Sequence, residues 1–261
     1  MKVTERRCLP RLTAVLALLP LAVACGGAHQ GSGGGTAAAG PAPGALGDTL
    51  VVTSDNGLRL RPADGHRVTV DGHVDQADRH WSHHAGTWVL DLSCGRRDDA
   101  DRGRDDAPCP RMPEVDVPDG VSVTVSARNA GIDAVGVPAG LDLTTVNGDV
   151  TVTRSGRSGD VTRLATRNGS VRAVALDARR LTAVTTNGDV ILACGTAPTA
   201  VTARTTNGSV GVTVPHDSPA YRVTAATANG RATVDVPARK AGHGPAMKLT
   251  TVNGDVDARR D

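Results

Sequence analysis

Three histidines lie close together in the sequence, at His80, His83 and His84. Imidazole is a good ligand for zinc, copper and nickel, so this cluster is a candidate metal site. In an extended strand, however, His80 and His84 point to one face and His83 points to the other. The sequence places no fourth ligand beside them, and a polar turn between strands accounts for the same composition. We expect no metal ion or other cofactor at this cluster.

A second set of reactive groups follows six Asn-Gly dipeptides, two residues after each asparagine. In chain order this position holds Asp149, Ser170, Asp189, Ser209, Arg231 and Asp255. Carboxylates along a β-helix can act as acid and base in polysaccharide lyases and hydrolases. Exchange with serine and arginine is instead typical of solvated turn positions, and the glycine-rich nonapeptide of calcium-binding β-rolls is missing. The chain also lacks a Walker loop, a Gly-x-Ser-x-Gly motif and a His-Glu-x-x-His motif, so we expect a protein that is not an enzyme.

The amino-terminal segment has the pattern of an export signal. Four basic residues, Lys2, Arg6, Arg7 and Arg11, precede an apolar run over residues 12–23. The run is shorter than the roughly 20 residues of a membrane-spanning helix, and it fits a signal peptide. It ends in Leu-Ala-Val-Ala-Cys25-Gly, which resembles a lipobox, so we expect Cys25 to carry diacylglycerol. The alternative is an ordinary secretory signal that is cleaved nearby and leaves Cys25 unmodified.

This interpretation divides the chain into a leader, a tether and a folded part. Residues 1–24 form the expected lipoprotein signal peptide, and residues 25–47 form a lipid-anchored linker of Gly, Ala and Pro. At about 5–6 Å × √n, the linker holds the folded part about 25 Å from the membrane. We therefore expect a lipid-anchored protein on the extracytoplasmic face of the cell membrane.

Two of the five cysteines, Cys94 and Cys109, bracket a segment rich in Arg and Asp. Such a segment cannot bury apolar surface, and an exported protein can close it with a disulfide. Closing a loop of this size stabilises the fold by roughly 3 kcal/mol in the chain-entropy model. A zinc site is the alternative, although the Cys-x-x-Cys spacing is absent. Cys8 lies in the leader, which leaves Cys194 unpaired.

The Asn-Gly dipeptides mark a repeat with spacings of 21, 19, 20, 22 and 24 residues. They begin at Asn147, Asn168, Asn187, Asn207, Asn229 and Asn253. Mostly apolar residues stand six and four positions before each asparagine and three and five positions after it, and threonine stands two before it in every copy. This alternation is typical of half-buried strands, and glycine suits the tight corner between them. The column seven residues after each asparagine includes Cys194, whose side chain we expect to point inward.

Two folds are compatible with strand–turn–strand units. A meander of hairpins is one, since Asn-Gly is also a strong hairpin signal. The near-constant spacing and the invariant threonine favour stacked coils, in which each column becomes a ladder. We therefore predict an all-β, single-domain parallel β-helix or solenoid of about 20-residue coils over residues 118–261, beginning with a degenerate coil around Asn129. A β-rich N-terminal cap is expected over residues 48–117.

The leader and the repeated Asn-Gly-Asp-Val and Asn-Gly-Ser-Val units resemble an adhesin-like family of bacterial β-solenoid lipoproteins, a family of unknown function. The resemblance implies an extracytoplasmic solenoid and brings no catalytic residues. We expect a structural or interaction module with the membrane as one partner and possible binding to cell-wall polymer or an envelope protein. Net charge is only +2 and aromatic residues are limited to Trp81, Trp88 and Tyr221, so no nucleic-acid partner is expected. The alternative is a carbohydrate-active β-helix enzyme acting on envelope polymers.

Overall fold

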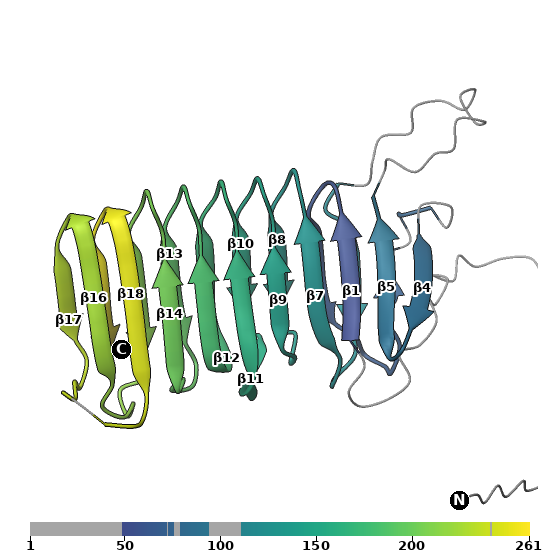
Figure 1. Cartoon of the computed structure of the whole chain (residues 1–261). Helices are drawn as coiled ribbons and strands as arrows, with labels where there is room; N and C mark the ends of the chain where they lie inside the picture. The colour runs from purple at the N-terminus through teal and green to yellow at the C-terminus, as the bar shows by residue number, and fades with distance from the viewer. Residues whose placement is uncertain (1–48, 72, 76–78, 94–110, 241) are drawn as a thin grey trace, which may run out of the picture. The chain divides into compact units, whose positions relative to one another are not determined.

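The computed structural model describes residues 49–71, 73–75, 79–93, 111–240 and 242–261, and all its regular elements are β-strands (Figure 1). The strands form two sheets, A and B. In stacking order, sheet A contains β4 (His80–His84), β5 (Thr87–Leu92), β1 (Thr49–Ser54), β7 (Ser122–Ala127), β9 (Leu141–Thr144), β11 (Gly156–Ala165), the second part of β12 (Val171–Val184), β14 (Ala200–Arg204), β18 (Ala246–Asn253) and β16 (Arg222–Asn229).

Sheet B lies opposite sheet A, and β12 passes through both. In the same order, sheet B contains β3 (Thr69–Val70), β6 (Glu114–Val117), β2 (Leu58–Pro62), β8 (Ile132–Val135), β10 (Val150–Thr153), the first part of β12, β13 (Val190–Cys194), β15 (Val210–Val214), β19 (Val256–Arg260) and β17 (Ala232–Asp235). No helix that could cross a membrane occurs among the described residues.

Each repeat coil from Leu141 onward runs along one strand of sheet A, turns at the Asn-Gly corner, and returns along one strand of sheet B. All strand pairs between coils are parallel, and the antiparallel pairs among the described strands are β3–β6 and β4–β5. A meander of hairpins would pair neighbouring strands antiparallel. The predicted β-solenoid is therefore confirmed, and the hairpin alternative is wrong.

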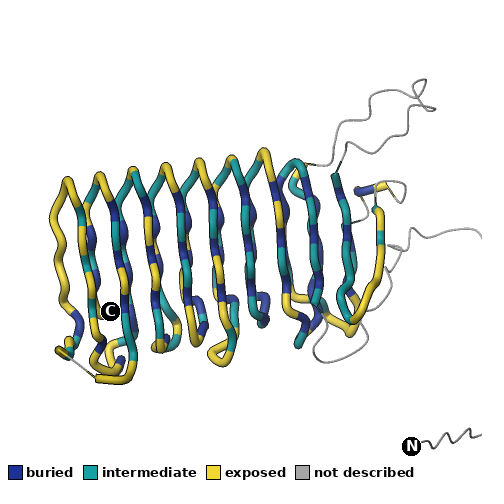
Figure 2. Tube along the Cα trace, viewed as in Figure 1, coloured by how far each residue is buried: buried dark blue, intermediate teal, exposed yellow. Residues whose placement is uncertain are grey.

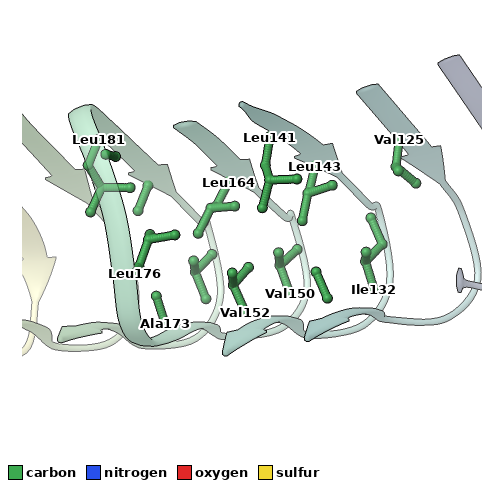
Figure 3. Packing of buried hydrophobic residues seen from close by; sticks show 14 of the residues in the cluster. Val125, Ile132, Leu141, Leu143, Val150, Val152, Leu164, Ala173, Leu176 and Leu181 are labelled. Atoms are coloured by element: carbon green, nitrogen blue, oxygen red, sulfur yellow. The ribbon is translucent and has the colours of Figure 1, made fainter. Parts of the chain in front are cut away.

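The core is a thin layer of aliphatic side chains between the two sheets. Leu143 and Leu164 project from sheet A, and Val150 and Val152 project toward them from sheet B (Figure 3). All four are fully buried. Burying an aliphatic side chain of this size stabilises the fold by about 1.5–3 kcal/mol. The alternating pattern of the sequence therefore places one short apolar layer in every coil, and aliphatic side chains fill most of it.

The coils are not stacked in the order in which the chain makes them. At one end, β1 lies between β5 and β7. At the other end, β18 and β19 lie between the coil of β14 and β15 and the coil of β16 and β17. The first and last coils of the described chain are thus each inserted one place inward. The second coil and the penultimate coil lie outside them (Figure 1).

The amino-terminal region is β-rich, as expected, and its described strands also continue the solenoid. Strands β1, β2, β5 and β6 pair in parallel and continue sheets A and B, so much of residues 48–117 forms two further coils of the same solenoid. The coil around Asn129 is internal, because β7 pairs with both β1 and β9. The repeat pattern is weaker in this part of the sequence, and it did not reveal these coils. Asn56-Gly57 is the single Asn-Gly dipeptide before Asn147, and the sequence between the two coils is longer than in the later repeats.

The corner glycines are required by close contact between coils. Gly188 has a φ of +138°, and a Cβ added there would lie 2.2 Å from the carbonyl oxygen of Gly169. The same contact recurs at Gly208, where the distance to the carbonyl oxygen of Gly188 would be 2.1 Å. A side chain at this corner would push adjacent coils apart.

We predict that Gly188→Ala lowers the free energy of unfolding by more than about 2 kcal/mol, through steric overlap and backbone strain. Gly211→Ala is the matched control, because a Cβ at Gly211 meets nothing within 4 Å. This control should be neutral or slightly stabilising. Denaturant unfolding of both variants measures the difference, and equal midpoints would contradict the close-contact explanation.

Candidate functional site

The six repeat asparagines form one continuous hydrogen-bonded ladder along the corner. Except at Asn147, which begins the ladder, each Nδ2 donates to the Oδ1 of the asparagine in the preceding coil of the stack, at 2.7–2.9 Å. The order along the ladder is Asn147, Asn168, Asn187, Asn207, Asn253 and Asn229. Every internal asparagine therefore donates one side-chain bond and accepts another.

The invariant threonines form a second ladder beside the first. The Oγ1 of Thr185 donates to the carbonyl oxygen of Gly169 at 2.7 Å, and the Oγ1 of Thr205 donates to that of Gly188 at 2.8 Å. Thr145, Thr166, Thr227 and Thr251 make the equivalent bond. The threonine thus satisfies a carbonyl group that the tight corner turns away from the strand ladder.

The aspartates and serines form a third ladder. The Oδ1 of Asp189 accepts the backbone N–H of Ser209 at 2.8 Å, and the Oγ of Ser209 accepts the N–H of Asp255 at 3.1 Å. Along the stack the column reads Asp149, Ser170, Asp189, Ser209, Asp255 and Arg231. Carboxylates and hydroxyls alternate, so no two carboxylates stand in adjacent coils, where their repulsion would cost about 1 kcal/mol even in water.

These bonds determine what the corner can do chemically. A pair of carboxylates that acts as general acid and general base needs two environments that differ. Here Asp149, Asp189 and Asp255 each accept the same kind of backbone N–H bond from the next coil. The asparagine and threonine side chains are likewise engaged between coils. The arrangement is suited to holding coils in register, and it sets no carboxylate apart as an acid or a base.

The structure divides the histidine cluster between two faces of β4. His83 stacks on Trp88, with ring centroids 4.1 Å apart, on the side where Trp81 packs against the core. His80 and His84 alternate with these residues and are exposed. In the described parts of the chain, no group of three His, Cys, Asp or Glu side chains is placed to hold a metal ion.

Three predicted site residues, Cys25, Cys94 and Cys109, lie outside the described residues. Lipidation at Cys25 and the Cys94–Cys109 disulfide therefore stay predictions.

The predicted inward column seven residues after each asparagine is only partly correct. Val214 and Val236 are buried, but Arg154 and Ala175 are exposed and have positive φ values of 45° and 51°. The backbone turns at these two positions, so the inward place passes to the next residue, for example to Leu176, which pairs with Cys194. Cys194 itself is half-buried against the core.

Burial, together with the nearby Asp177 carboxylate, raises the pKa of the Cys194 thiol from 9.0 to about 12. A thiol with a pKa in this range stays neutral and is a weak nucleophile at physiological pH. Cys194 is therefore a structural residue, with no sign of an activated cysteine.

Tyr221 is a core residue that the sequence interpretation missed. It is the largest fully buried side chain of the described chain. It lies directly before β16 in the outermost coil, where it pairs with Ala238. Burial raises the pKa of its hydroxyl, an effect that the neighbouring Ser218 hydroxyl opposes. Neither hydroxyl makes a well-formed hydrogen bond within the described chain. Tyr221 is the single aromatic residue of the repeats, and this was the signal in the sequence that could have marked it as a core residue.

A shallow hollow of about 270 Å³ lies on the outer face of sheet A, lined in part by Thr53, Asp55, Asp91 and Arg128. Its polar groups contact one another, because Asp91 accepts the Thr53 hydroxyl at 2.8 Å and Asp55 lies 3.9 Å from Arg128. Paired groups of this kind stabilise neighbouring coils.

We predict that Asn187→Ala costs about 1–2 kcal/mol of stability, because it removes two ladder hydrogen bonds. Asn229→Ala is the matched control at the end of the ladder, where only the bond to Asn253 is lost. It should cost about half as much. Chemical denaturation measures both, and equal costs would contradict a continuous ladder.

We predict that stability falls as pH rises from 9 to 12, partly through Cys194. The unfolded chain releases the thiol proton near pH 9.0, whereas the folded chain retains it up to about pH 12, so alkaline pH favours unfolding. Cys194→Ala removes this contribution and should show a smaller loss of thermal stability over the same window. Identical pH profiles, or rapid labelling of Cys194 in the folded protein, would show that the thiol is not buried.

Comparison with known proteins gives one family. The model of the Toastrack DUF4097 family matches residues 123–259, from β7 through β19. Two crystal structures are also similar: a candidate cell adhesion protein from Clostridium sporogenes (9% identity, 85% of this chain and 97% of that chain, TM-score 0.39) and a candidate adhesin from Bacteroides fragilis (11%, 82% and 92%, 0.40). No curated protein matches the chain. Because the family model covers more than half of the sequence, this protein belongs to the Toastrack DUF4097 family.

Proposed function

We propose that this protein is an adhesin-like cell-surface lipoprotein: a non-catalytic solenoid anchored through Cys25 on the outer side of the cytoplasmic membrane. The observation that carries the proposal is the use of the repeated polar side chains. Asparagine, threonine, aspartate and serine at each corner bond to the neighbouring coil. The repeat is therefore devoted to building a regular scaffold.

The order of segments supports anchoring. The first strand begins at Thr49, directly after the Gly, Ala and Pro linker of residues 25–47. A flexible linker of this composition separates a lipid from a folded domain without constraining either. The proposed anchor, tether and scaffold thus follow one another in the sequence.

The outward faces of the sheets support an interaction role. In sheet A, Thr182, Thr202 and Lys248 lie side by side in adjacent strands and point away from the core. Such rows repeat at about 4.8 Å from coil to coil and present hydroxyl and charged groups on a broad surface. A surface of this kind suits an extended partner, and we propose cell-wall polymer or another envelope protein.

A carbohydrate-active enzyme is the less favoured function. Sugar-binding grooves usually offer exposed aromatic rings, but Tyr221, the single aromatic residue after Trp88, is fully buried. The corner carboxylates are also equivalent to one another. The alternative therefore has no specific observation in its favour.

We predict that Cys25→Ser moves the protein from the membrane fraction to the soluble fraction. Without the thiol, diacylglycerol cannot be attached and the tether has no anchor. Cys8→Ser is the matched control, since Cys8 lies in the expected leader and its loss should leave fractionation unchanged. Mass spectrometry of the wild-type amino terminus should find the acyl groups. Membrane retention of the Cys25→Ser protein would overturn the anchor.

The soluble Cys25→Ser protein also tests the interaction role. Purified cell wall and envelope extract should retain it, and a Lys248→Glu variant should bind less. Release of soluble sugar fragments from the wall would instead establish the enzymatic alternative.

A further inference from the structure

The coil of β16 and β17 forms an open end of the solenoid. β16 pairs only with β18, and β17 pairs only with β19, within the described chain. The outer edges of both strands therefore carry backbone groups without ladder partners there. Unpaired edges are ready templates for another strand.

Interior columns are uncovered at this end. Ala232 and Val234 occupy columns that are buried in the other repeat coils, yet both are exposed, Val234 to 42%. Val223 and Ala225 on β16 are half-buried, whereas their counterparts Met247 and Leu249 are buried. Figure 2 shows this outermost coil exposed along most of its length. The apolar side chains of this coil therefore have no neighbouring coil on their outer side.

Another parallel coil would not be accommodated well. From Asp149 onward the third ladder supplies a side-chain acceptor for the backbone N–H of the following coil, and Arg231 stands at that position in the outermost coil. A guanidinium group has donors and no acceptor. Arg231 therefore ends the third ladder, which favours an occupant that pairs in the antiparallel direction.

We propose that a second copy of this chain covers the open end in a two-fold, tail-to-tail dimer, with β16 and β17 each pairing antiparallel with their equivalents. In a two-fold interface the same patch must complement itself. The inward and outward faces of each strand must also match across the pair.

Charge complementarity selects the register. Centring the β17 pair on Thr233 places Ala232 opposite Val234 of the other copy, so inward residues meet inward residues. The same register places Arg231 opposite Asp235, twice by symmetry. Both residues are exposed, and neither has an ion-pair partner within the described chain. Opposite charges directly across an antiparallel pair stabilise it.

The two strands agree on one symmetry axis. Centring the β16 pair on Ala225 matches inward residues, with Val223 opposite Thr227. Ala225 lies four residues before Asn229 and Thr233 lies four residues after it, so the two centres lie at similar heights below the corner. One two-fold axis can therefore pass through both pairs.

The opposite end of the solenoid does not offer an equivalent surface. There β4 pairs antiparallel with β5, and β3 pairs antiparallel with β6. Strands β3 and β4 cover part of the outer edges of the coil formed by β5 and β6, and their antiparallel pairing interrupts the parallel pattern. Assembly through the open end thus closes at two copies.

The test measures the mass of the soluble Cys25→Ser protein by light scattering over a range of concentrations. The Cys25→Ser protein without further substitutions should form a dimer whose fraction rises with concentration. Asp235→Arg and Arg231→Asp should each shift the dimer dissociation constant upward by at least tenfold, and the double variant should restore it. Asp257→Arg is the control, because Asp257 lies on the same face of an internal coil. A monomer at every concentration, or no rescue in the double variant, would overturn the proposal.

Thr233→Cys provides a second measurement that does not depend on affinity. Directly opposed residues of an antiparallel pair have Cα atoms about 4.5–5.5 Å apart, within disulfide range. Mild oxidation should therefore link two copies through this cysteine. Thr151→Cys, on an internal coil, should remain unlinked. Equal linking of the two variants, or none, would exclude the proposed register.

Discussion

The solenoid depends on the close approach of one Asn-Gly corner to the next. The carbonyl oxygen of Gly169 occupies the place where a side chain on Gly188 would stand, and the contact recurs in neighbouring coils. Backbone contact at this distance sets the corners directly above one another. The asparagine and threonine ladders then form because their side chains are brought to hydrogen-bonding distance at every step. An apolar layer of Val, Leu and Ala suffices as a core because the corners already determine the spacing.

The same dependence explains why polar residues that look reactive are structural. Asp189 accepts a backbone N–H from the next coil, and its neighbour Ser170 does the same for Asp189. Each such bond adds about 0.5–1.5 kcal/mol and favours one register of the stack. Function in this protein is therefore expected on the outward faces and at the ends of the solenoid, where side chains and strand edges are not used between coils.

The stacking order at the carboxyl-terminal end agrees with the third ladder. In chain order, Arg231 would stand between Ser209 and Asp255, and the N–H of Asp255 would lack its side-chain acceptor. Insertion of the last coil instead lets Ser209 serve Asp255 and places Arg231 at the end. The inserted β18 is also bonded on both edges, by β14 and by β16, so the end of the chain cannot separate without breaking two strand ladders.

The sequence by itself determined the repeat, the strand–corner–strand unit and the inward columns, because these depend on local alternation and on the glycine that a tight corner needs. Leu143, Leu164 and Val150 were all correctly predicted as core residues. Local pattern failed where the backbone departs from a strand, at Arg154 and Ala175, and it could not recognise the two coils before Ser122. Only the tertiary structure decided which coil lies next to which. The columns of β16 and β18 are similar, so the order of these coils depends on contacts between whole coils that no single repeat contains.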